Sequence, residues 1–236
     1  MKSLCVMPVY NQVAELPELL RRCRDHMPVD EFLIVDNGSD DGSGELIAGS
    51  GFHCIRLDHN YGIGRALRIG VEEALRLDCD VVLNIAGNGK MLPEQMDRIL
   101  EPLAAGDADY VTGSRFLAGG ESPNLPLFRR ISIPLVVNTV VRLLFHRKIT
   151  DATCGYRGFR LDLVKHPEVR WQDERLDRYQ FEYYLYAKAL KLKFRCVEVP
   201  ISMVYPPRGR RYSKIPPVVG WYQMLEPWIT VGLGIR

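Results

Sequence analysis

The chain runs through Glu31-Phe32-Leu33-Ile34-Val35 and then Asp36-Asn37-Gly38-Ser39-Asp40-Asp41-Gly42-Ser43, an apolar run followed at once by turn-forming residues. A short apolar run that ends in turn signals is typical of a buried parallel strand. An earlier apolar run, 4–10, has the same character and precedes a helical pattern that starts at about residue 13. The two runs therefore predict strands of one sheet with polar residues at their carboxyl ends.

Strands and helices continue to alternate along the chain, which predicts a single α/β domain over residues 1–236 with a C-terminal apolar segment at 216–235. The alternation favours a Rossmann-like, mostly parallel central sheet with helices on both faces. Ligands of such sheets bind at the carboxyl ends of the strands. The strands are expected at 3–8, 31–36, 53–57, 80–85, 109–113 and 194–203, and the helices at 13–24, 42–49, 62–76, 93–104, 128–145, 161–165 and 178–191.

Composition limits the class of protein. The chain has 236 residues, of which 47% are hydrophobic and 25% charged, enough for one domain with a substantial core. Its net charge of +2 does not predict nucleic-acid binding, although Arg and Lys cluster at 129–148 and 205–214. Segments 117–127 and 204–217 are rich in Gly, Pro and Ser, and they are expected to be mobile loops beside the ligand cleft.

The six cysteines are scattered without a Cys-x-x-Cys pair. This pattern indicates reduced core residues of a cytoplasmic protein rather than disulfides or a zinc site. The chain opens directly on a strand, which predicts no signal peptide. No segment reaches the roughly 18 consecutive apolar residues that a membrane-spanning helix needs.

Short motifs at the strand ends carry the functional signal. Together they resemble family 2 glycosyltransferases of the GT-A fold, and in particular the dolichyl-phosphate mannose synthases and bacterial polyprenyl-phosphate glycosyltransferases. The segments that carry the resemblance are Pro8-Val9-Tyr10-Asn11-Gln12, Asp36-Asn37-Gly38-Ser39, Asn60-Tyr61-Gly62-Ile63-Gly64, Gly113-Ser114-Arg115-Phe116, Asp151-Ala152-Thr153-Cys154-Gly155-Tyr156-Arg157, and Arg208 with Tyr212-Ser213-Lys214-Ile215.

One family motif is degenerate in this chain. At the end of strand 80–85 the family carries Asp-x-Asp, which holds a divalent metal on the sugar-nucleotide diphosphate. Here the triplet is Ala86-Gly87-Asn88, placed by the Pro93-Glu94 that usually follows it. Magnesium and manganese prefer anionic oxygen ligands, and only Asn88 offers any oxygen. The resemblance therefore implies a site in which metal is dispensable and in which Lys90 supplies the missing positive charge.

The resemblance also implies the residues that contact the nucleotide sugar. Asp36 is the family's base-reading position, and residues 208–214 form a loop that closes over the diphosphate. Each motif has a structural alternative: Asn11 is suited to cap a helix, Asp36 to form a turn, and Lys90 to be solvated. The implied donor residues are Pro8, Tyr10, Asn11, Gln12, Asp36, Asn37, Asn60, Gly64, Ala86, Gly87, Asn88, Lys90, Arg208, Ser213 and Lys214.

For the acceptor, the resemblance implies that Arg115 and Arg129 bind a phosphate, which the planar guanidinium suits. Asp151 is expected to position the acceptor. Glu182 is interpreted either as a base or as a residue that orients an arginine. A phosphate acceptor needs no base because its oxygen is already ionised at neutral pH.

These residues predict transfer of a sugar from a nucleotide diphosphate sugar to a phosphate-bearing acceptor, expected to be polyprenyl phosphate, with inversion. Two alternatives remain at this stage: an enzyme of the same fold with a soluble acceptor, and a nucleotide-binding pseudoenzyme. Segment 216–235 with the preceding basic residues is compatible with peripheral membrane contact and equally with a helix packed on the core.

Overall fold

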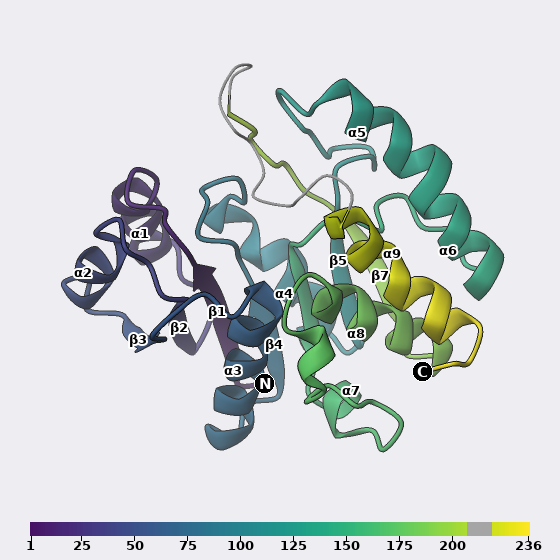
Figure 1. The fold of residues 1–236 in the computed structure, drawn as a ribbon, viewed down its shortest axis with the longest axis horizontal. Coiled ribbons are helices and arrows are strands. Elements are labelled where there is room, and N and C mark those ends of the chain that lie inside the picture. Colours follow the sequence, from purple (N-terminus) through teal and green to yellow (C-terminus); the bar gives the residue numbers. More distant parts are fainter. Residues whose placement is uncertain (207–218) are drawn as a thin grey trace.

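The computed structural model describes residues 1–206 and 219–236, which form one layered α/β domain (Figure 1). A seven-stranded sheet runs through it in the order β3-β2-β1-β4-β6-β5-β7. The strands are β1 Ser3–Val9, β2 Glu31–Asp36, β3 His53–Arg56, β4 Val81–Asn84, β5 Tyr110–Ser114, β6 Arg157–Arg160 and β7 Cys196–Pro200.

The helices fill the connections between the strands. They comprise α1 Leu16–Asp25, α2 Ser43–Ala48, α3 Ile63–Arg76, η1 Pro93–Gln95, α4 Met96–Ala104, α5 Leu127–Ser132, the π-helical η2 Ile133–Val137, α6 Asn138–Phe145, α7 Asp162–Lys165, η3 Glu174–Leu176, α8 Gln180–Lys191 and α9 Val219–Gly232.

The sheet is mostly parallel, as predicted. Strand β1 pairs in parallel with β2 and β4, β2 with β3, and β5 with β7. Strand β6 is the exception, because it runs antiparallel between β4 and β5. The sequence-based list missed β6, whose residues Arg157-Gly158-Phe159-Arg160 show no run of apolar side chains.

Two hydrophobic cores cover the two faces of the sheet. Along β1, Leu4 and Val6 belong to one core, while Cys5 and Met7 belong to the other, as the two-residue period of a strand requires. Helices α3, α6, α8 and α9 contribute to the first core, and α1, α2 and α4 to the second. The prediction of helices on both faces is confirmed.

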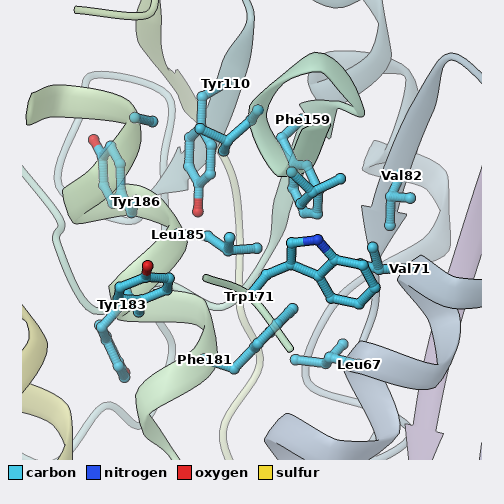
Figure 2. Close-up of a cluster of buried hydrophobic side chains, with 14 of the residues drawn as sticks. Leu67, Val71, Val82, Tyr110, Phe159, Trp171, Phe181, Tyr183, Leu185 and Tyr186 are labelled. Carbon is cyan, nitrogen blue, oxygen red and sulfur yellow. The ribbon is translucent and has the colours of Figure 1, made fainter. Parts of the chain in front are cut away.

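An aromatic cluster fixes β5 against α8 in the first core (Figure 2). The rings of Tyr110 and Tyr186 stack with centroids 4.7 Å apart and planes 6° apart. Trp228 of α9 packs edge-on against Tyr186 at 5.3 Å. Aromatic pairs stabilise a fold beyond the free energy gained by burying the rings. This cluster therefore fixes the position of β5 relative to α8.

Two apolar segments differ in detail from the predictions. The helix expected at 128–145 is divided by the π-helical turn at 133–137, which contains Pro134. Helix α9 continues through Pro227, although a proline at this place in the sequence predicts a limit on the length of the helix. Its residues Met224, Trp228 and Val231 are buried in the core, so this side of α9 packs on the core, as one of the two interpretations of the C-terminal segment predicts.

No helix within residues 1–206 and 219–236 is long and apolar enough to cross a membrane. All six cysteines lie in the described ranges and are unpaired. Four of them are buried, and Cys54 and Cys196 are half-buried.

Candidate active site

The predicted site residues gather where the parallel strands end. Strands β1, β2 and β4 run in the same direction, so the segments that follow them, 10–15, 37–42 and 85–92, lie along one edge of the sheet. Strand β5 points the same way as β4, since β6 is antiparallel to both. The segment that starts at Arg115 therefore shares this edge.

The segment after β1 is held by the segment after β2. Asn11 has a left-handed backbone (φ 51°), its Nδ2 donates to Asp40 Oδ1 at 2.8 Å, and its Oδ1 accepts from Asp40 N at 3.0 Å. The amide of Gln12 donates to Ser43 Oγ at 2.9 Å. Helix α1 starts only at Leu16, so the alternative of Asn11 as its cap is wrong. Pro8 and Tyr10 are half-buried beside this segment.

Asp36 and Asn37 are both engaged within the protein. Asp36 is fully buried, its Oδ1 accepts from Ser39 N at 3.0 Å, and its Oδ2 lies 3.2 Å from Arg56 Nε. Asn37 donates to Asn60 Oδ1 at 3.0 Å. The structural role foreseen for Asp36, forming a turn, is thus present, and its role in reading the base stays a prediction.

The expectation for Gly64 needs correction. In the family, the small residues at this helix start let the backbone approach the nucleotide, and the resemblance implies the same for Gly64. Here the space at its Cα faces the protein, where an added Cβ would lie 1.9 Å from Leu176 O. Its amide donates to Arg178 O at 2.8 Å, and the amide of Arg65 donates to Asp177 O at 3.0 Å. The first amides of α3 are thus used by the η3 segment and are not available to a phosphate.

The loop after β4 holds the degenerate motif. Gly87 lies against β1, where an added Cβ would meet Val9 Cγ2 at 2.7 Å. The side-chain oxygen of Asn88 accepts from the amide of Lys90 at 3.2 Å, and Gly89 makes the turn with φ +68°. Ala86 is half-buried and packs against the second core.

These groups do not fit a divalent metal. A methyl group, a glycine and one carboxamide provide no anionic oxygen, which magnesium and manganese require. Within residues 1–206 and 219–236, no three His, Cys, Asp or Glu side chains lie close enough together to hold a metal ion. We therefore derive no chemical step through a metal at this loop.

Lys90 points toward the chain that follows β7. Its ammonium lies 5.5 Å from the ring centroid of Tyr205, and its carbonyl accepts from Val204 N at 2.9 Å. A bridge between Met91 and Met203 continues this pairing. The loop after β4 is thereby joined to segment 203–205.

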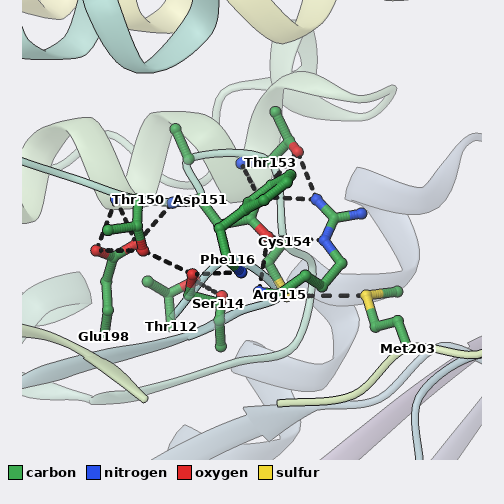
Figure 3. A network of polar contacts seen from close by, with 12 residues as sticks. Thr112, Ser114, Arg115, Phe116, Thr150, Asp151, Thr153, Cys154, Glu198 and Met203 are labelled. Atoms are coloured by element: carbon green, nitrogen blue, oxygen red, sulfur yellow. Dashed lines mark hydrogen bonds and ion pairs between the residues drawn. The ribbon is translucent and has the colours of Figure 1, made fainter. Parts of the chain in front are cut away.

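The acceptor-side residues form a buried polar network at the end of β5 (Figure 3). Arg115 donates from Nε to Asp151 Oδ2 at 2.7 Å and from Nη2 to Asp151 Oδ1 at 2.8 Å. Nη2 also donates to Thr153 Oγ1 at 2.8 Å, and Nη1 donates to the hydroxyl of Tyr205. Most of the five N–H groups of this guanidinium are therefore used inside the protein. Contact of Arg115 or Asp151 with an acceptor stays a prediction.

Two residues outside the predicted set hold the Asp151 segment in place. Glu198 of β7 accepts from Thr150 N at 2.7 Å and from Asp151 N at 2.8 Å. Asn138 of α6 donates to Thr150 O at 2.7 Å and accepts from Ala152 N at 3.1 Å. Burial raises the pKa of Glu198, and the amide donors oppose that shift. The sequence gives little indication of these roles, since Glu198 is a single acid in an expected strand and Asn138 a single amide in an expected helix.

Arg129 lies in the first turn of α5 and is half-buried. Burial raises the pKa of Tyr205, and the positive charges of Arg115 and Arg129 oppose this shift. The role of Arg129 in binding an acceptor phosphate stays a prediction.

Glu182 lies in the first turn of α8 and is half-buried. Its Oε1 accepts from Asn84 Nδ2 at 3.0 Å, and its backbone carbonyl accepts from Arg157 Nη1 at 2.6 Å. Desolvation raises the pKa of its carboxyl, and the charge of Arg157 opposes the shift. Glu182 thus contacts an arginine, through its backbone, and its role as a base stays a prediction. Arg208, Ser213 and Lys214 lie outside the described residues.

A hollow of about 350 Å³ opens beside the segment after β3. Three carboxylates line it, from Asp58, Glu174 and Asp177, against a single cation, Arg65. This charge balance disfavours a diphosphate there.

Comparison with known proteins agrees with this arrangement. The family profile of glycosyl transferase family 2 matches residues 4–166. An undecaprenyl-phosphate mannosyltransferase of Micrococcus luteus is 32% identical, with 86% of this chain and 84% of that protein covered. A polyprenol monophosphomannose synthase of Mycolicibacterium smegmatis is 31% identical, with 85% and 77% covered.

Among solved structures, glucosyl-3-phosphoglycerate synthase of Mycobacterium tuberculosis in complex with Mn²⁺, UDP and glucosyl-3-phosphoglycerate superimposes with a TM-score of 0.68. It is 16% identical, and 99% of this chain and 79% of that chain are covered, which supports the GT-A fold alone. The family profile covers more than half of the chain, and the chain belongs to glycosyl transferase family 2.

Proposed function

We propose that the protein transfers a sugar from a nucleoside diphosphate sugar to a polyprenyl phosphate, with inversion and without a metal. The observation that carries the acceptor class is the buried Arg115–Asp151 pair at the end of β5, and the family resemblance adds Arg129 to it. Two relatives above 30% identity are named for transfer to, or synthesis of, polyprenyl-linked mannose, which supports the same acceptor class.

The reaction is a single displacement. An ionised oxygen of the acceptor phosphate attacks the anomeric carbon, a new carbon–oxygen bond forms, and the bond to the β-phosphate oxygen breaks. The electron pair leaves with the nucleoside diphosphate, and attack from the opposite side inverts the anomeric carbon. No proton has to be removed from the acceptor, so no general base is required.

Positive side chains stabilise the charge on the departing diphosphate. Lys90 is the described candidate, and Arg208 and Lys214 are predicted partners from outside the described residues. Arg129 then binds the acceptor phosphate. Arg115, which is already bound to Asp151, holds this end of the site rigid.

Peripheral membrane contact is part of this proposal, because a polyprenyl chain stays in the bilayer. Most large apolar side chains that are exposed in the described part of the protein lie on two neighbouring elements, α5–α6 and α9. Leu135 and Leu143 are each 69% exposed. We define the apolar face as Leu127, Phe128, Ile131, Leu135, Val136 and Leu143, together with Tyr222 and Ile229 of α9 and Leu233, which directly follows α9.

The charges around the apolar face favour an anionic membrane as its occupant. Residues 122–150 contain five Arg or Lys (129, 130, 142, 147 and 148) and no Asp or Glu. Apolar side chains interleaved with cations suit the interface of a bilayer with acidic lipids. A second copy of the chain would bring like charges together, which opposes self-association through this face.

Transfer activity tests the proposal directly. The purified protein is screened with UDP- and GDP-sugars by thermal shift, since a ligand that binds the native state raises its stability. The donor that binds is then incubated with undecaprenyl phosphate in detergent, with and without EDTA, and the lipid product is detected. We expect a sugar phosphate lipid in both conditions. Transfer only to water-soluble phosphates, or donor binding without turnover, would refute the proposed acceptor.

A further inference from the structure

Tyr205 lies between two positive side chains that come from different loops. Its side chain is buried, with 3% of the residue exposed. Its hydroxyl accepts a hydrogen bond from Arg115 Nη1, and the ammonium of Lys90 lies 5.5 Å from the centre of its ring. One aromatic side chain thus contacts a cation of the donor side and a cation of the acceptor side.

The backbone around Tyr205 is fixed as well. Its amide donates to Pro123 O at 3.1 Å, and its carbonyl accepts from Asn124 Nδ2 at 3.2 Å. The preceding amide, of Val204, donates to Lys90 O at 2.9 Å. These bonds tie the residue to two loops at once, so the ring is held in one position.

The two contacts use different parts of the tyrosine. The face of an aromatic ring is electron-rich and attracts an ammonium group, whereas the phenolic oxygen accepts hydrogen bonds. The ammonium here is that of Lys90, and the hydrogen-bond donor is the guanidinium of Arg115. Tyr205 attracts both and keeps them at separate, defined places.

We propose that Tyr205 is a positioning residue that holds the ammonium of Lys90 in a fixed place relative to the Arg115–Asp151 pair. This inference rests on the proposed function, in which Lys90 faces the donor diphosphate. Stabilisation of a developing charge works best when the cation is already in position before the reaction. The ring face of Tyr205 attracts the ammonium without accepting a proton or adding a formal charge to the site.

A double-mutant cycle tests this role. Tyr205→Leu removes the ring face, and Tyr205→Phe keeps the ring but removes the hydroxyl. Both are made in the wild-type protein and in Lys90→Ala, and affinity for UDP and for GDP is measured by calorimetry. Loss of a cation–π contact predicts that Tyr205→Leu weakens nucleoside diphosphate binding by about 2- to 30-fold. In the Lys90→Ala background it should cause no further loss, because the residues act together.

Tyr205→Phe is the matched control, since it retains the ring and nearly the same volume. It should retain nucleoside diphosphate affinity within about twofold. An equal loss from Tyr205→Leu in both backgrounds, or a loss from Tyr205→Phe as large as that from Tyr205→Leu, would overturn the role of the ring. If Tyr205→Leu does not fold, Tyr205→Met takes its place as the variant without a ring, and Tyr205→Phe remains the control.

The outcomes separate this inference from the proposed function. If Lys90→Ala alone leaves nucleoside diphosphate binding unchanged, the proposed role of Lys90 is wrong, and with it the reason for positioning that side chain. If Lys90→Ala weakens binding but Tyr205→Leu does not, only the inference about Tyr205 is overturned.

Discussion

Asp151 and Arg115 form an enclosed two-point ion pair, with Nε–Oδ2 at 2.7 Å and Nη2–Oδ1 at 2.8 Å. Their side chains are 0% and 2% exposed, so water cannot replace either partner. A buried pair of this kind adds little net stability compared with apolar residues, but removing one partner leaves an uncompensated charge. The pair therefore makes the acceptor end of the site rigid and sensitive to mutation.

Asp151→Ala should lower the free energy of unfolding by about 3–5 kcal/mol, the range for breaking a buried ion pair. Urea unfolding measures the change. Asp25→Ala is the control, since Asp25 pairs with Arg21 at 2.6 Å on the surface, with both side chains about 60% exposed, and should cost under about 1 kcal/mol. Equal effects of the two variants would contradict a structural role for the buried pair.

The fold could be predicted from the sequence because most of its strands are continuous apolar runs, which can be recognised from neighbouring residues alone. Runs such as 31–36 are apolar throughout and end in turn residues, and the structure gives strand β2 the predicted bounds. Strand β6 could not be found this way. Its Arg157 is buried, and its guanidinium donates to the carbonyls of Ala152 and Cys154 in the preceding loop and of Glu182 in α8. A buried arginine held by backbone carbonyls leaves no apolar pattern in the sequence.

The site was predictable in part for a similar reason. Motif positions identified the strand ends and assigned Arg115 and Asp151 to one acceptor site, but they did not predict that the two side chains pair with each other. They gave no sign of Tyr205 or of the clamp by Glu198, because these contacts depend on how β7 and the chain after it lie beside β5. Gly64 was misinterpreted because its neighbour in space, segment 176–178, is more than 100 residues away along the chain.

Removal of metal should leave the protein functional. With Ala86 and Asn88 at the metal-binding positions, we expect donor binding and transfer to be nearly unchanged in EDTA. The double variant Ala86→Asp/Asn88→Asp restores two carboxylates and should make thermal stabilisation by UDP or GDP dependent on manganese. Loss of most wild-type activity in EDTA, with recovery in manganese, would show that other residues build a metal site.

Lys90→Ala should weaken donor binding by about 1.5–3 kcal/mol, the range for a hydrogen bond to a charged group. This corresponds to roughly 10- to 150-fold in the dissociation constant. Lys165→Ala, at an exposed lysine that ends α7, is the control and should have no effect. If the Lys90 variant binds the donor as tightly as the control variant does, the proposed contact between Lys90 and the diphosphate is wrong.

Glu198 should make stability depend on pH above its ordinary pKa of 4.5, because burial raises its pKa in the folded protein. As pH rises through 4.5, the unfolded chain loses this proton first, so the unfolded state is favoured until the folded group also ionises. Wild-type stability should therefore fall relative to Glu198→Gln as pH rises above 4.5. Glu45→Gln is the control, because the pKa of Glu45 is lowered by its own backbone amide and by Arg56. Parallel stability curves for the wild type and Glu198→Gln in urea at several pH values would refute this.

Membrane binding should depend on the apolar face defined on α5–α6 and α9. Leu135→Glu/Leu143→Glu adds two negative charges to exposed positions and should abolish co-sedimentation with vesicles that contain phosphatidylglycerol. The control is Leu46→Glu on α2, also exposed, at the opposite end of the molecule (Figure 1). It should bind vesicles like the wild type.

These surface variants test membrane binding more specifically than a truncation of the chain after Ile215 would. Truncation removes Trp228, which is fully buried against Tyr186, so it would damage the core as well as the surface. Both leucines point into solvent, and their replacement should leave the thermal unfolding midpoint and nucleoside diphosphate binding unchanged. Vesicles of phosphatidylcholine alone should bind the wild-type protein weakly, because the basic residues of 129–148 then lack anionic partners. Binding that survives the double substitution, or that ignores lipid charge, would move the lipid contact away from the apolar face.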